Sequence, residues 1–300
     1  MSYFKDKYAA ITGAASGLGL GISERFLERG GKAVYMADRN GELLRYEAGE
    51  LAARYPGQVF IRQTDVADQS QVQALIDCAV SEWGRIDFLF NNAGLPMTRP
   101  TERTTSEEFE KLVQVNLLGP AYGTLAVLDI MRRQGSGHIV NTASLGGLLP
   151  IPFQTAYCAT NAAVIAMTRC MAYEYAESGI YFSQLSPGNV ATPIFAAEQV
   201  EKMRKEGKSE AEIRQKVKSV KPPEGAMPLD EALDILFRGV EQQQTDILCG
   251  VVAQEGYRLF CTDRAAYDEL VMQKVERRRA FYKELYRALE CGDPLPSFPG

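Results

Sequence analysis

Ser144 and Tyr157 have side chains and a separation that are compatible with acid–base chemistry. Ser144 ends an apolar stretch typical of a strand, and Tyr157 follows thirteen residues later in a stretch typical of a helix. Hydride transfer to a carbonyl leaves an alkoxide, which needs a positioned acid and a second hydrogen-bond donor. A phenol and a hydroxyl could supply both. From these two residues alone, structural roles are preferred, in which Ser144 caps a helix and Tyr157 is a core aromatic.

A glycine-rich segment near the N-terminus shifts that balance, because it has the pattern of a phosphate-binding loop. The sequence ITGAASGLGLG follows the first apolar stretch and opens the first helical one. Backbone N–H groups at such a helix N-terminus stabilise a pyrophosphate, and glycine keeps side chains out of its way. The candidate cofactor-binding residues of this loop are Gly13, Ser16, Gly17, Leu18 and Gly19.

Asp38 ends the second apolar stretch, nineteen residues after Gly19. A carboxylate there can accept hydrogen bonds from both hydroxyls of an adenosine ribose, and it repels a 2′-phosphate. Arg39 is the counter-argument, since a guanidinium could pair with that phosphate. Because Asp38 stands at the strand tip and Ser16 of the loop is uncharged, the sequence favours NAD over NADP.

Short apolar strands alternate with amphipathic helices along the chain, and these elements must position the candidate residues. The expected strands are 8–14, 33–38, 59–66, 86–94, 137–144, 180–188 and 246–251. Helices are expected over 19–30, 70–84 and 105–134, the last with a capping box of Thr105 and Glu108. This alternation predicts an α/β fold with a doubly wound parallel sheet of the Rossmann type.

The last third of the chain contains a charged segment that differs from the apolar strands and amphipathic helices before it. Residues 193–228 are charged and helical in pattern, which predicts a lid over a binding cleft; a solvated surface insertion is the alternative. The sequence therefore predicts one nucleotide-binding domain over 1–253, including this lid, and a helical extension over 254–300 of one or two helices. Nothing in the extension suggests chemistry; it could cover the domain or build a subunit contact.

Composition limits the class of protein. The net charge is −5 and the pI is about 5.3, which argues against nucleic acid or an anionic membrane as the main partner. No leader segment or membrane-spanning run is evident, so a cytoplasmic protein is expected. The six cysteines lack the spacing of metal ligands, so no metal site is expected. His138 is interpreted as a structural or surface residue, because it lies at the start of a strand and away from the carboxyl end where a site would form.

Seven short motifs follow one another along the chain. They are TGAASGLG, TDV with Asp65, NNAG (91–94), VNLLG with Asn116, NTAS with Ser144, then Tyr157, and SPGNVATP (186–193). In this order they resemble the short-chain dehydrogenase/reductase family, from about residue 8 to residue 250.

The resemblance implies a role for each matching residue. Ser144 would hydrogen-bond the substrate oxygen, Tyr157 would exchange a proton with it, and Asn116 would hold a water in the proton relay. Asp65 and Val66 would hold the adenine. The remaining implied cofactor contacts are Asn92, Ala93, Gly94, Pro187, Gly188, Val190 and Thr192.

Asn161 departs from the family pattern, which has lysine four residues after the tyrosine. That lysine lowers the tyrosine pKa and hydrogen-bonds the nicotinamide ribose. Asn161 can make the hydrogen bond but carries no charge. Without the cation, Tyr157 would keep a pKa near 10, so loss of the lysine should impair alcohol oxidation more than ketone reduction at neutral pH. Lys221 is a candidate substitute cation.

Three hypotheses for function remain open. The first is an NAD-dependent alcohol/ketone oxidoreductase in which Asn116, Ser144, Tyr157 and Asn161 form an altered catalytic set. The others are an unusual or non-redox reaction on the same scaffold and a weakly catalytic NAD-binding sensor or scaffold. Residues 95–97 and 145–153 are apolar, which favours a hydrophobic substrate. A homodimer or homotetramer is expected.

Overall fold

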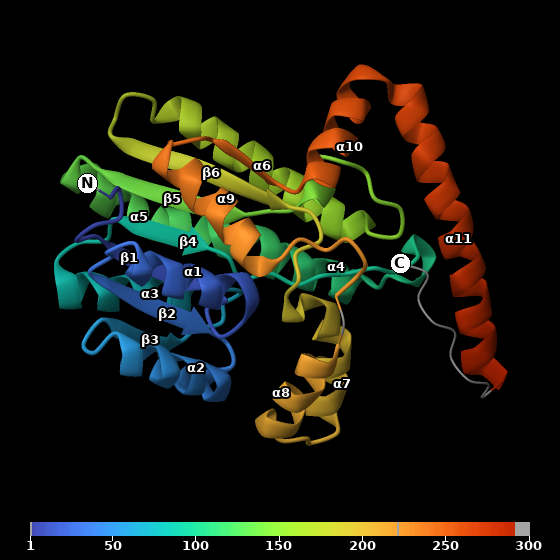
Figure 1. The fold of residues 1–300 in the computed structure, drawn as a ribbon, viewed down its shortest axis with the longest axis horizontal. Helices are drawn as coiled ribbons and strands as arrows, with labels where there is room; N and C mark the ends of the chain where they lie inside the picture. Colours follow the sequence, from blue (N-terminus) through green and yellow to red (C-terminus); the bar gives the residue numbers. More distant parts are fainter. Residues whose placement is uncertain (1, 221, 292–300) are drawn as a thin grey trace.

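The computed structural model of the chain describes residues 2–220 and 222–291. Within them a parallel sheet has the order β3-β2-β1-β4-β5-β6-β7 (Figure 1). Its strands are β1 (Tyr8–Thr12), β2 (Ala33–Asp38), β3 (Val59–Gln63), β4 (Phe88–Asn91), β5 (Gly137–Thr142), β6 (Ile180–Pro187) and β7 (Asp246–Cys249). The helices are α1 (Gly17–Glu28), α2 (Gly41–Arg54), α3 (Gln69–Trp83), α4 (Ser106–Leu112), α5 (Gly119–Gln134), α6 (Thr155–Glu174), α7 (Ala197–Lys205), α8 (Glu210–Ser219), α9 (Leu229–Glu241), α10 (Val251–Thr262) and α11 (Arg264–Cys291).

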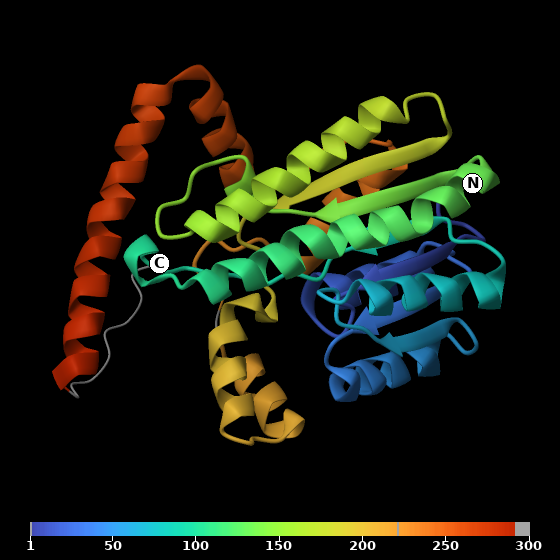
Figure 2. The ribbon, with the colours of Figure 1, turned by 180° about the vertical axis from the view of Figure 1, so that it is seen from behind.

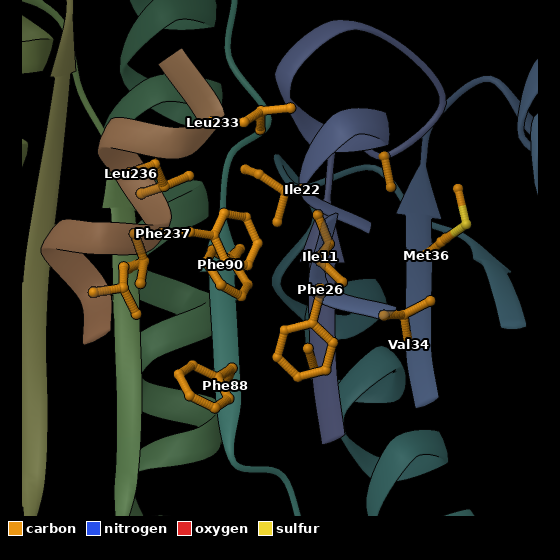
Figure 3. Packing of buried hydrophobic residues seen from close by; sticks show 14 of the residues in the cluster. Ile11, Ile22, Phe26, Val34, Met36, Phe88, Phe90, Leu233, Leu236 and Phe237 are labelled. Atoms are coloured by element: carbon orange, nitrogen blue, oxygen red, sulfur yellow. The ribbon is translucent and has the colours of Figure 1, made fainter. Parts of the chain in front are cut away.

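Helices cover both faces of the sheet, because successive side chains of each strand point to opposite faces. Ile11 of β1 and Phe90 of β4 belong to a core that includes Ile22 of α1 and Leu236 of α9 (Figure 3). The intervening Ala10 belongs instead to a second core with residues of α3 and α5. Both faces of β1 and β4 are therefore buried, which is why these two strands are largely apolar runs.

The order of the strands reverses between β1 and β4. The chain runs outward from β1 through β2 to β3, then returns to β4 and continues outward on the other side. In open sheets of this kind, ligands bind outside the carboxyl ends of the strands at the reversal point. The expected doubly wound parallel sheet is confirmed, and its topology places a binding site at the ends of β1 and β4.

Most strands end two or three residues earlier than the sequence predicts, while β2 has the predicted bounds. The excess residues at the predicted carboxyl ends include Gly13, Asp65, Asn92 and Ser144. They leave the sheet and form the loops at its edge. Apolar patterning does not separate the last strand residues from the first loop residues, because both are largely buried.

The expected helix over 105–134 is interrupted. Its capping box of Thr105 and Glu108 is confirmed, but a π-helical turn, Val113–Leu118, separates α4 from α5. Pro120 explains the break, because it lacks the N–H that would bond the carbonyl of Asn116 in an unbroken α-helix. The turn contains Asn116, one of the candidate site residues.

The final third contains two helical pairs beyond the sheet. α7 and α8 follow a 3₁₀ turn, Pro193–Ala196, and project from the same edge as the strand ends (Figure 1). The last described part of the chain forms two helices, α10 and the long α11. α10 begins at Val251, three residues before the expected start of the extension, and α11 descends beside that edge (Figure 2). None of the helices in the described ranges has the length and apolar character needed to cross a membrane.

Candidate functional site

The candidate residues meet in one continuous cleft at the carboxyl ends of the strands. The cleft is lined by Gly13, Ser16, Gly17, Leu18, Asp38, Asp65, Val66, Asn92, Ala93, Gly94, Asn116, Ser144, Tyr157, Asn161, Pro187, Gly188, Val190 and Thr192. Gly19 is the exception among the sequence candidates. It lies beneath the loop, where an added Cβ would come within 2.1 Å of the Gly13 carbonyl oxygen. Its role is the close packing of the loop on α1.

The glycine-rich loop presents a helix N-terminus to the cleft. Gly13 and Gly17 have φ values of 66° and 55°, the left-handed region that favours glycine. Ser16 is the N-cap of α1, yet its side chain makes no capping hydrogen bond. The first-turn N–H groups of α1 therefore border the cleft without a side chain over them, which suits a pyrophosphate.

Asp38 lies at the end of β2 and lines the cleft, as the sequence predicts. Its Oδ2 accepts a hydrogen bond from the backbone N–H of Ala15 at 3.2 Å, and its Oδ1 accepts one from Asn40 at 2.9 Å. The carboxylate thus fixes the glycine-rich loop against β2. Both bonds hold it in a defined position from which its remaining lone pairs can accept further hydrogen bonds.

Thr12 organises the floor of the cleft, a role that the sequence analysis missed. Its Oγ1 accepts hydrogen bonds from the backbone N–H groups of Asn92 at 3.0 Å and Ala93 at 3.1 Å. The Asn92 side chain donates back to the Thr12 carbonyl at 3.2 Å and accepts from the Thr142 hydroxyl at 3.3 Å. These bonds join the ends of three neighbouring strands. A small hydroxyl directly before Gly13 was the sequence signal.

Ser144 and Tyr157 are brought together, as expected. The Ser144 hydroxyl accepts a hydrogen bond from the Gly146 N–H at 3.1 Å and caps the 3₁₀ turn Leu145–Gly147, so its structural interpretation is also correct. Burial raises the pKa of the Tyr157 phenol, and a hydrogen bond with Ser144 opposes that rise. The pair therefore offers a protonated phenol and an adjacent hydroxyl at one point of the cleft.

Asn161 lies one helical turn after Tyr157 and is only 5% exposed. Its Nδ2 donates to the Tyr157 carbonyl oxygen at 2.8 Å, so the amide is turned back along its own helix. Gly147 packs on this turn, where a Cβ would come within 2.7 Å of the Asn161 carbonyl carbon. Lys221, the candidate substitute cation, lies outside the described residues.

Asn116 lies in the π-helical turn and fixes the loop after Gly94. Its Oδ1 accepts from the Leu95 N–H at 2.8 Å, and its Nδ2 donates to the Leu95 carbonyl at 2.9 Å. Both polar atoms of one side chain thus hold one residue. This pairing places Leu95 and the apolar residues after it at the substrate end of the cleft.

The segment after β6 closes the cleft over the glycine-rich loop. Val190 forms a parallel bridge with Met227, and the Ala191 N–H donates to the Met227 carbonyl at 2.8 Å. Thr192 consequently faces the start of α1, where a Cβ on Gly17 would meet its side chain at 3.4 Å. The cleft is therefore bordered on two sides by segments that the sequence motifs identified.

The C-terminal helix α11 reaches the cleft that residues 95–97 and 149–152 also line, although the sequence indicated no site residue in the extension. Its inner face contributes Tyr267, Arg278 and Tyr282 to the cleft lining. The spacing of apolar residues in α11 indicates one buried face, but the spacing alone does not identify the surface that the face covers.

His138 is structural. It is 1% exposed at the start of β5, and its ring nitrogens are hydrogen-bonded to the Tyr3 hydroxyl at 3.2 Å and the Ser183 hydroxyl at 2.8 Å. Burial lowers its pKa to about 3. The residue lies at the opposite end of the strand from the cleft, so it takes no part in the site.

Comparisons with known proteins agree with this geometry. A family model described as short chain dehydrogenase matches residues 7–203. Levodione reductase of Leifsonia aquatica is 39% identical over 192 residues, which are 64% of this chain and 72% of the relative. The 2-(R)-hydroxypropyl-CoM dehydrogenase of Xanthobacter autotrophicus (strain ATCC BAA-1158 / Py2) is 38% identical over 191 residues, 63% of this chain and 76% of that one.

A solved structure is similar over the whole length. It is a short chain dehydrogenase/reductase from Burkholderia phymatum in complex with NAD, with a TM-score of 0.72, 27% sequence identity and full coverage of both chains. The chain belongs to the short-chain dehydrogenase/reductase family, whose members are oxidoreductases that bind nicotinamide cofactors.

Proposed function

We propose that this protein is an NAD(H)-dependent oxidoreductase that interconverts a secondary alcohol and a ketone. The observation that carries the proposal is the hydrogen-bonded Ser144–Tyr157 pair in the same cleft as the glycine-rich helix N-terminus. An acid–base pair beside a dinucleotide site suits carbonyl chemistry. The relatives named levodione reductase and 2-(R)-hydroxypropyl-CoM dehydrogenase favour the same class of reaction.

The cofactor-binding role is assigned to the residues that border the loop end of the cleft. The first turn of α1 would hold the pyrophosphate, Asp65 and Val66 the adenine, and Asp38 the adenosine ribose. We infer a preference for NAD because the Asp38 carboxylate is held at the end of β2, where a 2′-phosphate would meet its charge. The bound nicotinamide supplies or accepts the hydride.

The residues of the chain handle the proton and the substrate oxygen. Tyr157 donates a proton to the oxygen of a ketone as it is reduced, and takes one back in the reverse direction. Ser144 donates a hydrogen bond to the same oxygen and stabilises its developing charge. Asn116 is proposed to hold a water of the proton relay, since an amide oxygen can accept a second hydrogen bond.

Asn161 stands where the family pattern has lysine, and we infer that the substitution sets the preferred direction. Burial already raises the pKa of Tyr157, so the phenol is protonated throughout the neutral range. A protonated phenol serves ketone reduction, whereas alcohol oxidation needs the phenolate. We therefore propose ketone reduction as the favoured direction near pH 7.

Two further assignments belong to this proposal. The pair α7–α8 acts as a lid within the domain over 1–253, which is supported by Val200, Ile213 and Val217 in the cleft lining. Homo-oligomer formation is supported by exposed apolar side chains on the outer helices, with Leu125 of α5 66% exposed and Tyr173 of α6 83% exposed.

A panel of ketones and secondary alcohols tests the function. Wild type should oxidise NADH with at least one ketone, and Tyr157→Phe should reduce kcat on the order of 100-fold or more while NADH affinity changes little, because the phenol ring remains. NADH binding by fluorescence titration is the control. Binding of NADH without turnover of any panel member would refute the enzyme hypothesis and favour the sensor or scaffold.

A further inference from the structure

One face of α11 lines the end of the cleft where the substrate is proposed to bind. Tyr267, Val271, Val275, Arg278 and Tyr282 recur at spacings of four, four, three and four residues, so they share a face of the helix. Tyr267, Val275 and Tyr282 are buried, while the residues between them are mostly exposed. The face is therefore in contact with the body of the protein along much of its length.

Three polar side chains of this face hold two loops of the cleft. Tyr267 donates to the Pro150 carbonyl at 3.1 Å, Arg278 donates to the Pro152 carbonyl at 2.7 Å, and Tyr282 donates to the Thr98 carbonyl at 3.0 Å. The ring of Tyr282 also contacts that of Phe153, with centroids 5.2 Å apart. These bonds make α11 a wall of the cleft.

The two loops are joined to each other as well. The Arg99 N–H donates to the Phe153 carbonyl at 2.6 Å, and the Gln154 side chain donates to the Thr98 hydroxyl at 2.8 Å. Phe153 adopts a φ of 68°, which a non-glycine residue holds only where its surroundings fix it. The wall is thus a defined surface built from the helix and both loops.

Arg278 is the cation of this face that reaches inward. Its side chain is half-buried and lines the cleft, and burial lowers the pKa of its guanidinium. The guanidinium lies near enough to the Cys158 thiol to lower that thiol's pKa, although burial is the larger effect and raises it. Cys158 adjoins Tyr157 on α6. Arg278 bonds the Pro152 carbonyl and lines the same cleft as Tyr157, so it lies on the side of the cleft formed by the loop that contains Pro152.

The charge around this end of the cleft is positive. Among the described residues of 97–103 and 254–286, the charged side chains that line it are Arg99, Arg103, Arg258, Lys274, Arg278 and the single carboxylate Glu255. Arg99 is paired with Glu108, and Arg103 lies over the ring of Tyr286. The excess of cations raises the local concentration of anions.

We propose that Arg278 binds an anionic oxygen-bearing group of the substrate, a carboxylate, sulfonate or phosphate, at the end of the molecule remote from the reacting carbonyl. The proposal rests on the proposed function, because it concerns the substrate of the same cleft. A guanidinium has five N–H donors in a planar fork, so it can hold the Pro152 carbonyl and an oxyanion together. The family match ends at residue 203, so α11 brings this specificity from outside the matched segment.

Binding to the NADH complex tests the proposal without requiring turnover. The probes are a series of methyl ketones of equal chain length that end in a carboxylate, a sulfonate, a phosphonate or a neutral methyl ester, titrated calorimetrically into wild type. At least one anionic ketone should bind about 10- to 100-fold more tightly than the ester, because charge-assisted hydrogen bonds to arginine are strong. The best anion identifies which group the site takes.

Variants of α11 assign that preference to one side chain. Arg278→Gln should remove the preference for the anion over the ester, and Arg278→Lys should keep part of that preference. The affinity for NADH should change little in both variants. Arg277→Gln is the matched control, since Arg277 is the exposed neighbour on the same helix and does not line the cleft.

Two results would overturn the proposal. One is equal binding of the anions and the ester by wild type. The other is an equal loss of the preference in Arg277→Gln and Arg278→Gln, which would mean a diffuse field in place of a site. Failure of the proposed function looks different, since an anionic ketone would then bind through Arg278 without being reduced.

Discussion

The charge missing at position 161 can be restored, and the result measured as a shift in the pH profile of alcohol oxidation. Asn161 is one helical turn after Tyr157, and residues so spaced have Cβ atoms about 5 to 6 Å apart. We take about 5 Å as the distance from a lysine ammonium at position 161 to the phenol oxygen. At an effective dielectric constant of about 20, two unit charges at that distance interact by roughly 3 kcal/mol. This corresponds to about 2 pKa units.

The sign of the shift follows from the phenol. Burial raises the pKa of Tyr157 above its ordinary value of 10, so oxidation by wild type should climb through pH 9–10 without a plateau at neutral pH. In Asn161→Lys the phenolate is stabilised by the cation, and the rising limb should move about 2 pH units lower. Oxidation at pH 7 should increase on the order of 100-fold, whereas ketone reduction should change much less.

The assay is the initial rate of NAD reduction from pH 6 to 10.5, with the best alcohol of the panel. Asn161→Met is the control, because its side chain is similar in length to lysine and uncharged. NADH titration and thermal denaturation show whether both variants fold, since burial of an ammonium at a site only 5% exposed costs stability. An effect of charge on the phenol is refuted if folded Asn161→Lys has the same pH profile of alcohol oxidation as wild type. It is also refuted if the profile of Asn161→Met moves as far to lower pH as that of Asn161→Lys.

Two other predictions concern the cofactor and the fold. Asp38→Ala should reduce the preference for NADH over NADPH by about 10-fold or more, since it removes both a ribose acceptor and a charge that repels phosphate; equal binding of the two cofactors by wild type, in fluorescence titrations, would contradict the assignment. His138 has a folded pKa of about 3, below its unfolded value of about 6.5, so the unfolded chain binds the extra proton and stability is lost as pH falls through that window. In His138→Gln, the free energy of unfolding measured with urea should therefore fall less steeply between pH 6.5 and 4 than in wild type, by about 1 kcal/mol per pH unit. If the free energies of the two proteins fall in parallel with pH, the histidine is not responsible.

The cofactor end of the site could be predicted from the sequence because its geometry is local. Gly13, Gly17 and Asp38 lie at fixed positions in a strand–loop–helix–strand unit, and the Asp38 carboxylate accepts its hydrogen bonds from backbone N–H groups of neighbouring residues in the same part of the chain. The same holds for Ser144 and Tyr157, which a short loop separates. Their types and spacing therefore carry most of the information about their arrangement.

The break between α4 and α5 could not be predicted from apolar periodicity. The pattern continues across Asn116, because a π-helical turn adds only a fraction of a turn to the phase of the helix. The sequence signal was Pro120, whose missing N–H leaves the carbonyl one turn earlier without its helical partner. Its consequence, the pairing of Asn116 with Leu95, depends on a loop from another strand.

The fold class, the place of the glycine-rich loop and Asp38 in the cleft, and the contact of Ser144 with Tyr157 follow from the sequence, because each rests on residues close together in the chain. How α11 completes the cleft depends on contacts between residues far apart in the chain. Arg278 and Tyr282 lie more than a hundred residues from Pro152 and Thr98, and their contacts depend on where α10 directs α11. An amphipathic face shows that a helix packs, but its partner is a long-range choice that periodicity does not encode.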